Sequence, residues 1–207
     1  PPRKAGDLEI VRYAFDLAPD RPPQRALQNE WGLALHCQSW QGNASRQILI
    51  DFGYTPETLN NNLALLKVDT RELDALVLSH GHYDHFGGLN GFLSANAGRL
   101  KPGLPFYLGG EECFCSRETG PTDAHSNFGA LDRRAIADAG LRVLFAERPS
   151  LLADHGFTTG YIPSVSFEKP LQPSRMKVGL KDGVGCAPEG LPAEKRNLTI
   201  VPDDFQH

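Results

Sequence analysis

Four of the six residues from His80 to His85 are types that bind metal ions in proteins, namely His80, His82, Asp84 and His85. We call this segment the histidine loop. Alternate residues of an extended chain face the same side, so His80 and His82 can point together. Imidazole binds zinc, iron or manganese, and a carboxylate adds negative charge that helps to hold a second cation. The spacing predicts a site for two divalent metal ions, with zinc as the first choice and iron or manganese as alternatives.

The histidine loop follows a short apolar run and precedes two glycines. Residues 75–78 read Ala-Leu-Val-Leu, which is typical of a strand that is buried on both faces. Gly87 and Gly88 let the backbone pass close to the site, because glycine has no Cβ. The sequence therefore predicts that a buried strand runs directly into the histidine loop.

The rest of the chain alternates between strand and helix patterns. We expect helices at 55–67, 86–94 and 131–139, a short one near Glu111, and strands at 8–15, 31–37, 47–51, 105–108 and 141–146. Beyond residue 164 only 197–201 has a recognisable pattern, so we expect 164–207 to be largely loop. The prediction is one α/β (α+β) domain over residues 1–207, with mixed sheets and covering helices.

Composition narrows the range of partners and compartments. The net charge is -4 and the chain has no dense run of Lys or Arg, so we expect no nucleic-acid partner. The longest apolar runs are strand-sized, so we expect no membrane association. Cys37, Cys113, Cys115 and Cys186 lack the spacing of a disulfide framework, which favours buried or idle thiols and a cytoplasmic protein. Cys113 and Cys115 alone, without a second pair nearby, give little support for a soft-metal site.

The segment from Ser79 to Leu89, SHGHYDHFGGL, resembles the His-x-His-x-Asp-His signature of the metallo-β-lactamase superfamily. Residues 29–33, 48–53 and 76–79 resemble the branch of dihydropterin ribofuranosylaminobenzene phosphate synthase-like proteins. The resemblance covers about 8–175 and is weaker in its second half. It implies an αββα sandwich with the site at one sheet edge. There His80 and His82 would hold the first metal ion, and Asp84 and His85 the second.

The resemblance also implies roles for Asp51 and for water. Asp51 matches an aspartate at a strand end, where it would accept a hydrogen bond and orient a ligand. A simple turn residue is the alternative. Two cations would activate a water molecule for attack, so no Ser or Cys nucleophile is needed. Asp84 would then also handle the proton of that water, in competition with its role as a ligand.

The superfamily pattern is incomplete in this chain. A later histidine, a bridging carboxylate and a last histidine complete the site in the superfamily, and the expected Cys-Ser-His segment has no counterpart here. We therefore expect a sandwich that lacks part of its second half. Three explanations stay open: a second protein chain supplies the missing part, His125 or His155 does so, or the sequence is a fragment. We favour the second chain, which would cover an exposed sheet face. His36 and His207 are expected to lie outside the site.

The leading hypothesis is a metal-dependent hydrolase of a small-molecule ester, phosphoester, amide or activated aryl ether. It would act as one subunit of a split or hetero-oligomeric enzyme. The branch resemblance offers a pterin-related transferase or synthase as an alternative, but function follows the site rather than the fold. A non-catalytic scaffold subunit of a metal hydrolase complex is the third hypothesis. Metal content separates the enzymes from the scaffold, because a scaffold needs no metal.

Overall fold

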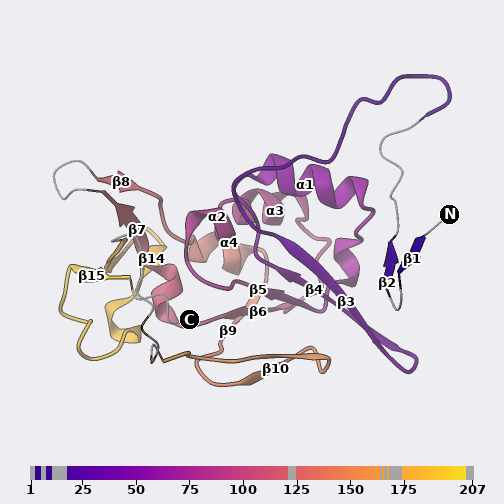
Figure 1. Ribbon diagram of the computed structural model, residues 1–207. Helices are drawn as coiled ribbons and strands as arrows, with labels where there is room; N and C mark the ends of the chain where they lie inside the picture. Colours follow the sequence, from indigo (N-terminus) through magenta and orange to yellow (C-terminus); the bar gives the residue numbers. More distant parts are fainter. Residues whose placement is uncertain are drawn as a thin grey trace.

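A five-stranded sheet forms the centre of the molecule (Figure 1). The computed structural model describes residues 3–5, 8–10, 18–120, 125–163, 165, 167 and 174–203. In spatial order the strands are β3 (Leu35–Gln41), β4 (Ala44–Ile50), β5 (Ala75–Val77), β6 (Pro105–Leu108) and β9 (Arg142–Phe145). The β3–β4 pair is antiparallel and the three pairs from β4 to β9 are parallel. The carboxyl ends of four strands therefore meet at one edge of the sheet.

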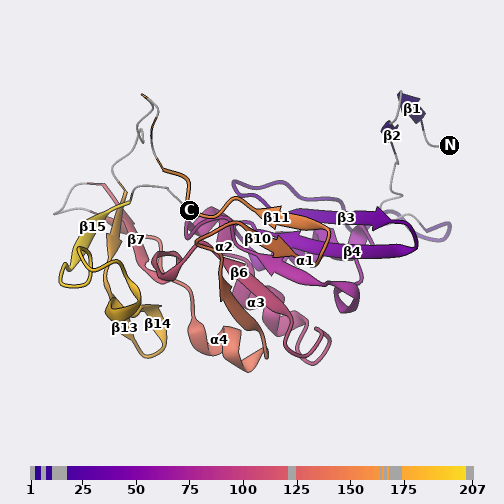
Figure 2. The ribbon, with the colours of Figure 1, turned by 90° about the horizontal axis from the view of Figure 1, so that it is seen from below.

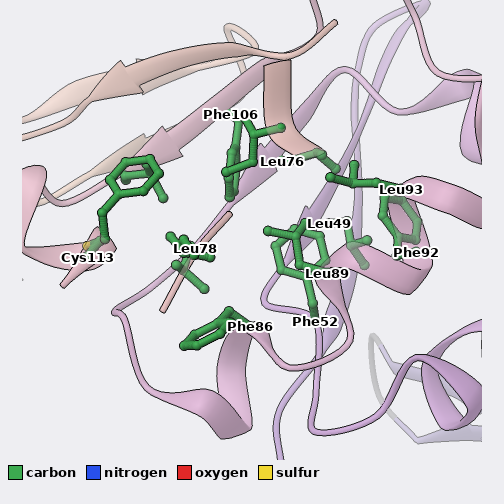
Figure 3. Close-up of a cluster of buried hydrophobic side chains, with 14 of the residues drawn as sticks. Leu49, Phe52, Leu76, Leu78, Phe86, Leu89, Phe92, Leu93, Phe106 and Cys113 are labelled. Carbon is green, nitrogen blue, oxygen red and sulfur yellow. The ribbon is translucent and has the colours of Figure 1, made fainter. Parts of the chain in front are cut away.

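Helices cover one face of this sheet. They are α1 (Pro56–Leu65), α2 (Tyr83–Phe86), α3 (Leu89–Ala95) and α4 (Arg133–Asp138). Helix α1 begins where the sequence predicts, because Thr55 accepts a hydrogen bond from the Thr58 backbone and Pro56 occupies the first turn. Side chains from the sheet and the helices form the main core, which includes Leu49, Phe52, Leu76, Leu89, Phe92 and Phe106 (Figure 3).

The opposite face carries a smaller apolar cluster. Ile48, Ala75 and Val77 point to this side, while their neighbours Leu49 and Leu76 point to the helices. The hairpin of β10 (Ser150–Leu152) and β11 (Gly156–Thr158) lies across the cluster (Figure 2) and contributes Leu152 to it. The alternation explains why the run at 75–78 reads as a strand that is buried on both faces.

A smaller antiparallel sheet lies beside the end of the main sheet that carries α2 (Figure 1). Its strands, in spatial order, are β15 (Ile200–Pro202), β12 (Arg175–Lys177), β7 (Ser116–Thr119) and β8 (Ser126–Asn127). The remaining elements are the hairpins β1 (Arg3–Ala5)–β2 (Leu8–Ile10) and β13 (Gly179–Lys181)–β14 (Val184–Cys186), and the 3-10 helices η1 (Thr70–Glu72), η2 (Glu111–Phe114) and η3 (Pro188–Gly190).

The C-terminal segment differs from the largely loop structure that we expected for 164–207. Its described part holds β12, β13, β14 and β15, each only three residues long. Such short strands give no periodic pattern, and β12 gains its hydrogen bonds from β7, which lies far earlier in the chain. Long-range pairing therefore forms β12 and β15, whereas β13 and β14 pair with each other in a short hairpin whose three-residue strands give too little pattern to be recognised.

The expectation that all four cysteines are thiols was wrong for two of them. Cys115, next to β7, forms a disulfide with Cys186 at the end of β14. The two residues are 71 positions apart, so only the fold brings them together. Cys113 is a buried thiol and Cys37 an exposed one. Burial raises the pKa of the Cys113 thiol.

Several predicted boundaries also shift for identifiable reasons. The strand expected at 31–37 begins at Leu35, because the backbone of Leu33 pairs with Asp84 and Gly53 instead of a neighbouring strand. The helix expected at 86–94 is α3, which begins only at Leu89, and the short helix α2 ends at Phe86 before Gly87 and Gly88. A Cβ on either glycine would lie 2.2 Å from a backbone oxygen of the adjoining chain. The strand expected at 8–15 is β2 over 8–10, and residues 11–15 lie outside the described part.

The mixed α/β fold class with sheets and covering helices is confirmed. Every helix in the described part of the chain is too short or too polar to cross a lipid bilayer.

Candidate functional site

The structure brings the four metal-binding residue types of the histidine loop together at the carboxyl ends of β4 and β5. The ring centroid of His80 lies 4.5 Å from that of His82 and 4.1 Å from that of His85. A carboxylate oxygen of Asp84 lies 3.8 Å from His85 Nε2. These residues are the ones that the spacing singled out, and the loop gathers them in one place.

Asp51 lies beneath the histidine loop, immediately after β4. Its side chain is fully buried and accepts hydrogen bonds from the Ser79 backbone N–H at 2.7 Å and from the Ser79 hydroxyl at 2.8 Å. His85 Nδ1 lies 2.7 Å from the same carboxylate. Asp51 has φ 61°, a left-handed conformation that Asp tolerates better than most residues and that turns the chain sharply after the strand. The carboxylate is therefore placed to orient His85.

Asp203 holds His82 from the opposite end of the chain. It follows β15, is buried, and its Oδ2 lies 2.8 Å from His82 Nε2. Arg117, on β7, donates from Nε to the same oxygen at 2.8 Å, and the Ser174 hydroxyl lies 3.4 Å away. Arg117 is also buried, and its Nη1 donates to the backbone carbonyls of Glu112 and Cys115. The smaller sheet is thereby joined to the histidine loop through one carboxylate.

These carboxylates select the tautomers of the histidines. An ionised carboxylate only accepts hydrogen bonds, so His85 Nδ1 and His82 Nε2 carry the protons that they donate to Asp51 and Asp203. In the neutral rings the lone pairs are then on His85 Nε2 and His82 Nδ1. His80 Nδ1 lies 3.0 Å from the Ser79 hydroxyl oxygen. When Nδ1 donates its proton to this oxygen, the lone pair of the His80 ring is on Nε2. Metal-binding histidines are usually fixed by such partners.

The protonation of the histidines follows from burial and neighbouring charge. Burial lowers the pKa of His80 to about 4, and the nearby His85 and His82 add to the effect. Burial also opposes charge on His85, but the hydrogen bond to Asp51 outweighs it and raises the pKa of His85. Burial opposes charge on Asp203, yet His82 and Arg117 hold its pKa well below the ordinary value. His80 is thus kept in the neutral form that binds metal ions.

The donor types suit a divalent cation, but their positions do not form a finished metal site. Among the described residues no group of three or more His, Cys, Asp or Glu side chains converges closely enough to hold a metal ion. Three imidazoles and one carboxylate on a single loop are nevertheless ligand types that zinc binds in proteins. The residues therefore fit a metal chemically, and binding one requires their donor atoms to turn toward a common point.

The other candidate histidines lie elsewhere. His155 follows Asp154, which pairs with Arg46 near the start of β4, whereas the histidine loop lies beyond the end of that strand. His155 Nδ1 is buried without a hydrogen-bond partner there. His125 pairs with Glu118 at 3.6 Å, at the β7–β8 hairpin. The structure does not bring either residue into the histidine loop.

Two further histidines were expected outside the site. His36 lies on β3, and its Nε2 is 3.0 Å from the Gln47 side chain, away from the loop. His207 is outside the described residues.

Sequence reasoning missed Asp203 and Arg117. Asp203 is 121 residues from His82, and nothing in the segment IVPDD marks one of its aspartates as a site residue. Arg117 is part of a polar stretch in which charged residues are common. Neither position carries a local signal, because the contacts exist only once the smaller sheet has formed.

A cavity of about 340 Å³ opens beside the histidine loop, and His82 and Asp84 are part of its lining. This volume is within the usual range for small-molecule sites, which is roughly 300–1,000 Å³. A small molecule bound in the cavity would therefore touch the histidine loop.

Comparisons with known proteins agree with the sequence motif. Residues 41–99 match the family model of the Metallo-beta-lactamase superfamily. Over 90 residues the chain is 29% identical to the 7,8-dihydropterin-6-methyl-4-(beta-D-ribofuranosyl)-aminobenzene-5'-phosphate synthase of Methanocaldococcus jannaschii, which covers 44% of this chain and 30% of that protein. The chain thus spans less than a third of this curated relative. The resemblance that the histidine loop predicts, to the superfamily and to this branch, is confirmed.

Two similar solved structures are subclass B3 metallo-β-lactamases. MEM-A1, isolated from a soil metagenome library, has a TM-score of 0.37 and 16% identity over 74% of this chain and 57% of its own. The other is described as the first B3 metallo-β-lactamase with an active-site glutamic acid. It has a TM-score of 0.33 and 20% identity over 52% of this chain and 39% of its own.

Proposed function

We propose that this chain carries the metal-binding part of a hydrolase that cleaves a small-molecule ester, phosphoester, amide or activated aryl ether. The observation that carries the proposal is the gathering of His80, His82, Asp84 and His85 beside a cavity, above the buried carboxylate of Asp51. The match of residues 41–99 to the Metallo-beta-lactamase superfamily supports it. The proposed cofactors are two divalent ions, with zinc as first choice and iron or manganese as alternatives.

The position of each residue in the histidine loop suggests its role in the proposed reaction. His80 and His82 would hold one ion, and Asp84 and His85 the second, through the lone pairs that their tautomers leave. Bound divalent ions lower the pKa of water toward neutrality and polarise the bond to be cleaved. Asp51 keeps His85 in the required tautomer. Asp84, partly exposed at the cavity, is placed to accept a proton from water or substrate.

We further propose that a second protein chain completes the site. On the outer side of the β10–β11 hairpin, Leu151 and Phe157 pair across the strands and are 70% and 74% exposed. Exposed apolar pairs of this kind favour coverage by another surface. The cytoplasmic location stays a prediction. Disulfides are rare in that compartment, so the redox state of Cys115 and Cys186 in cells would test it.

A second candidate function is a pterin-related transferase, which the similarity to the Methanocaldococcus jannaschii synthase favours. The two candidates differ in what they consume. A hydrolase forms product from one organic substrate and water, whereas a transferase needs a second organic substrate. The scaffold hypothesis predicts neither reaction.

Chelation and restoration of activity test the proposed function. The protein, expressed together with its neighbouring genes, is assayed with 4-nitrophenyl acetate and bis(4-nitrophenyl) phosphate before and after removal of metal by 1,10-phenanthroline. We expect hydrolysis of at least one compound, its loss on chelation and its return with zinc. His82→Ala should abolish the activity and the control His36→Ala should retain it. Equal activity of both variants, or no effect of the chelator, would contradict the proposal.

A further inference from the structure

The cavity beside the histidine loop has an unusual lining. Four of its nine lining residues are aromatic, and they come from separate parts of the chain: Trp31, Tyr54, Tyr83 and Phe128. Aromatic faces bind other flat rings by stacking and by edge contacts. The composition of the walls therefore indicates what kind of molecule the cavity accepts.

Trp31 is the most exposed of these residues, at 82%, yet its backbone is firmly placed. The carboxylate of the preceding Glu30 accepts hydrogen bonds from the backbone N–H groups of Tyr54 and Thr55, at 2.7 and 2.8 Å. The Thr55 hydroxyl donates to its other oxygen at 2.6 Å. Although burial opposes its charge, these hydrogen bonds lower the pKa of Glu30. These hydrogen bonds fix the backbone that carries the indole at the edge of the cavity.

The backbone of the two residues after Trp31 contacts the histidine loop directly. The Leu33 N–H donates to the Asp84 carbonyl at 3.1 Å. A Cβ on Gly32 would lie 2.8 Å from that carbonyl and 2.8 Å from the Tyr54 nitrogen, so only glycine fits between them. The backbone next to Trp31 is therefore attached directly to the ligand-bearing loop.

The two tyrosines form the neighbouring wall. Tyr54 and Tyr83 meet edge to face, with ring centroids 4.8 Å apart and planes at 78°. Tyr83 belongs to the histidine loop itself, and Tyr54 follows the turn after Asp51. A ring that stacks in this cavity would be adjacent to the residues proposed to hold the metal ions.

The same cavity offers little to bind a charged group of a substrate. Arg117 is among the lining residues, but its guanidinium is buried and already donates to Asp203 and to two backbone carbonyls. The partly exposed carboxylate of Asp84 is also part of the lining. A substrate would therefore be recognised mainly through a ring and not through an anionic group.

We propose that this aromatic cavity binds a flat aromatic ring and so presents a bond attached to that ring to the histidine loop. This inference rests on the proposed hydrolase function. It narrows the proposed substrates to aryl esters, aryl phosphoesters and related aromatic compounds. Trp31 is a specificity-determining residue that covers the ring, and Tyr54 and Tyr83 contact its edge. Aliphatic compounds of equal size and charge bind more weakly.

Calorimetry with an inert pair of compounds tests the ring preference without any reaction. The probes are naphthalene-2-sulfonate and its saturated decahydro counterpart, which share charge and carbon skeleton but differ in flatness. Stacking on one aromatic side chain changes affinity by about tenfold. We expect the flat probe to bind at least about tenfold more tightly, Trp31→Ala to remove most of this preference, and Trp31→Phe to restore part of it.

Trp40→Ala is the matched control, because Trp40 is also exposed but lies on β3, outside the cavity lining. It should leave binding unchanged. Equal affinity for the two probes, or an unchanged preference in Trp31→Ala, would overturn the inference. Thermal unfolding of each variant shows whether the fold is intact, and the high exposure of Trp31 predicts that it is.

Hydrolysis separates failure of this inference from failure of the proposed function. The substrates are 2-naphthyl acetate and the acetate ester of the saturated alcohol. Selective binding of the flat sulfonate without hydrolysis of either ester would keep the ring preference and reject the hydrolase. Hydrolysis of both esters with kcat/KM values in the same ratio as their rates of alkaline hydrolysis, together with equal binding of both sulfonates, would keep the hydrolase and reject the ring preference.

Discussion

Asp203 contacts the buried Arg117 and the partly exposed His82 at the same time, so it joins the smaller sheet to the histidine loop. Its carboxylate neutralises Arg117 and accepts a hydrogen bond from His82. A buried guanidinium without a counter-charge is strongly destabilising, so removal of Asp203 affects both the smaller sheet and the loop. The residue therefore links the stability of one part of the chain to the orientation of a proposed metal ligand in another.

The first prediction concerns Asp203→Asn. Asparagine keeps the shape but loses the charge, and an orienting partner of a ligand histidine typically accounts for about 10- to 100-fold in metal affinity. We expect zinc affinity, measured by competition with a chromogenic chelator, to fall by about tenfold or more. The exposed Asp182, at the β13–β14 turn, gives the control Asp182→Asn. If both variants bind zinc like the wild type, Asp203 has no part in orienting His82.

The second prediction concerns Glu30 and pH. Hydrogen bonds lower the folded-state pKa of Glu30 below its ordinary value of 4.5. A group with a lowered pKa contributes stability that is complete above the unfolded-state pKa and is lost as pH falls through the folded-state pKa. Wild-type stability should therefore decline more steeply below pH 4.5 than that of Glu30→Gln. Urea unfolding between pH 3 and 6 measures this difference, and parallel pH curves would speak against it.

The sequence revealed the part of the site that is contiguous. His80, His82, Asp84 and His85 fall within one loop, so their spacing was enough to predict that they gather. Asp51 was predictable because it ends a recognisable strand. Asp203, Arg117 and Trp31 were not, because their proximity to the loop depends on long-range pairing and on backbone contacts that leave no local pattern.

The β10–β11 hairpin is the element that covers the second face of the main sheet among the described residues. Leu152 is buried against Ile48, Ala75 and Val77, whereas its neighbour Leu151 is 70% exposed. The two leucines differ in burial but not in chemical type. They form a matched pair for testing how much the hairpin stabilises the fold.

The third prediction compares Leu152→Ala with Leu151→Ala. Removal of a buried leucine side chain costs about 2–5 kcal/mol, while exposed substitutions usually stay within about 0.5 kcal/mol. We expect Leu152→Ala to lower the free energy of unfolding by about 2 kcal/mol, the low end, because its cluster is small. Leu151→Ala should be close to neutral. Chemical unfolding measures both, and equal effects would show that the hairpin does not dock as described.

The Cys115–Cys186 disulfide gives the fourth prediction. It joins η2 and β7 to β14 across 71 residues of sequence, and a cross-link of that span contributes up to about 4 kcal/mol in the chain-entropy account. Replacing both cysteines by serine should lower the free energy of unfolding by an amount of that order. Dithiothreitol should destabilise the wild type and the control Cys37→Ser, but not the double variant. No effect of the reductant on the wild type would contradict the disulfide.

Elements with strong local signals were predicted and elements built by pairing were not. Helix α1 carries a cap, a first-turn proline and apolar periodicity, and β5 carries a continuous apolar run. Strands β12 and β15 are three residues each and pair with distant parts of the chain, while β13 and β14 are equally short and pair with each other in a hairpin. The helix predicted at 86–94 begins only at Leu89, after two glycines at which a Cβ would meet backbone oxygens of the adjoining chain, a tertiary requirement that local sequence does not show.

At the scale of the whole molecule, the two faces of the main sheet differ in how they are covered. Helices cover one face with a large apolar core, while a single hairpin lies on the other among the described residues. The smaller sheet at the edge contributes Asp203 to the histidine loop. The molecule thus places the buried Asp51, Arg117 and Asp203 near the histidine loop and leaves Leu151 and Phe157 exposed on the hairpin, where the proposed second chain would bind.

The content of bound zinc tests the central claim most directly. The purified protein is saturated with zinc, dialysed and analysed by inductively coupled plasma mass spectrometry, beside His82→Ala/His85→Ala and the control His36→Ala. We predict about one to two zinc ions per chain in the wild type and in His36→Ala, and almost none in the double variant. Zinc content in the wild type no higher than in the double variant would contradict the assignment of the histidine loop as a metal site.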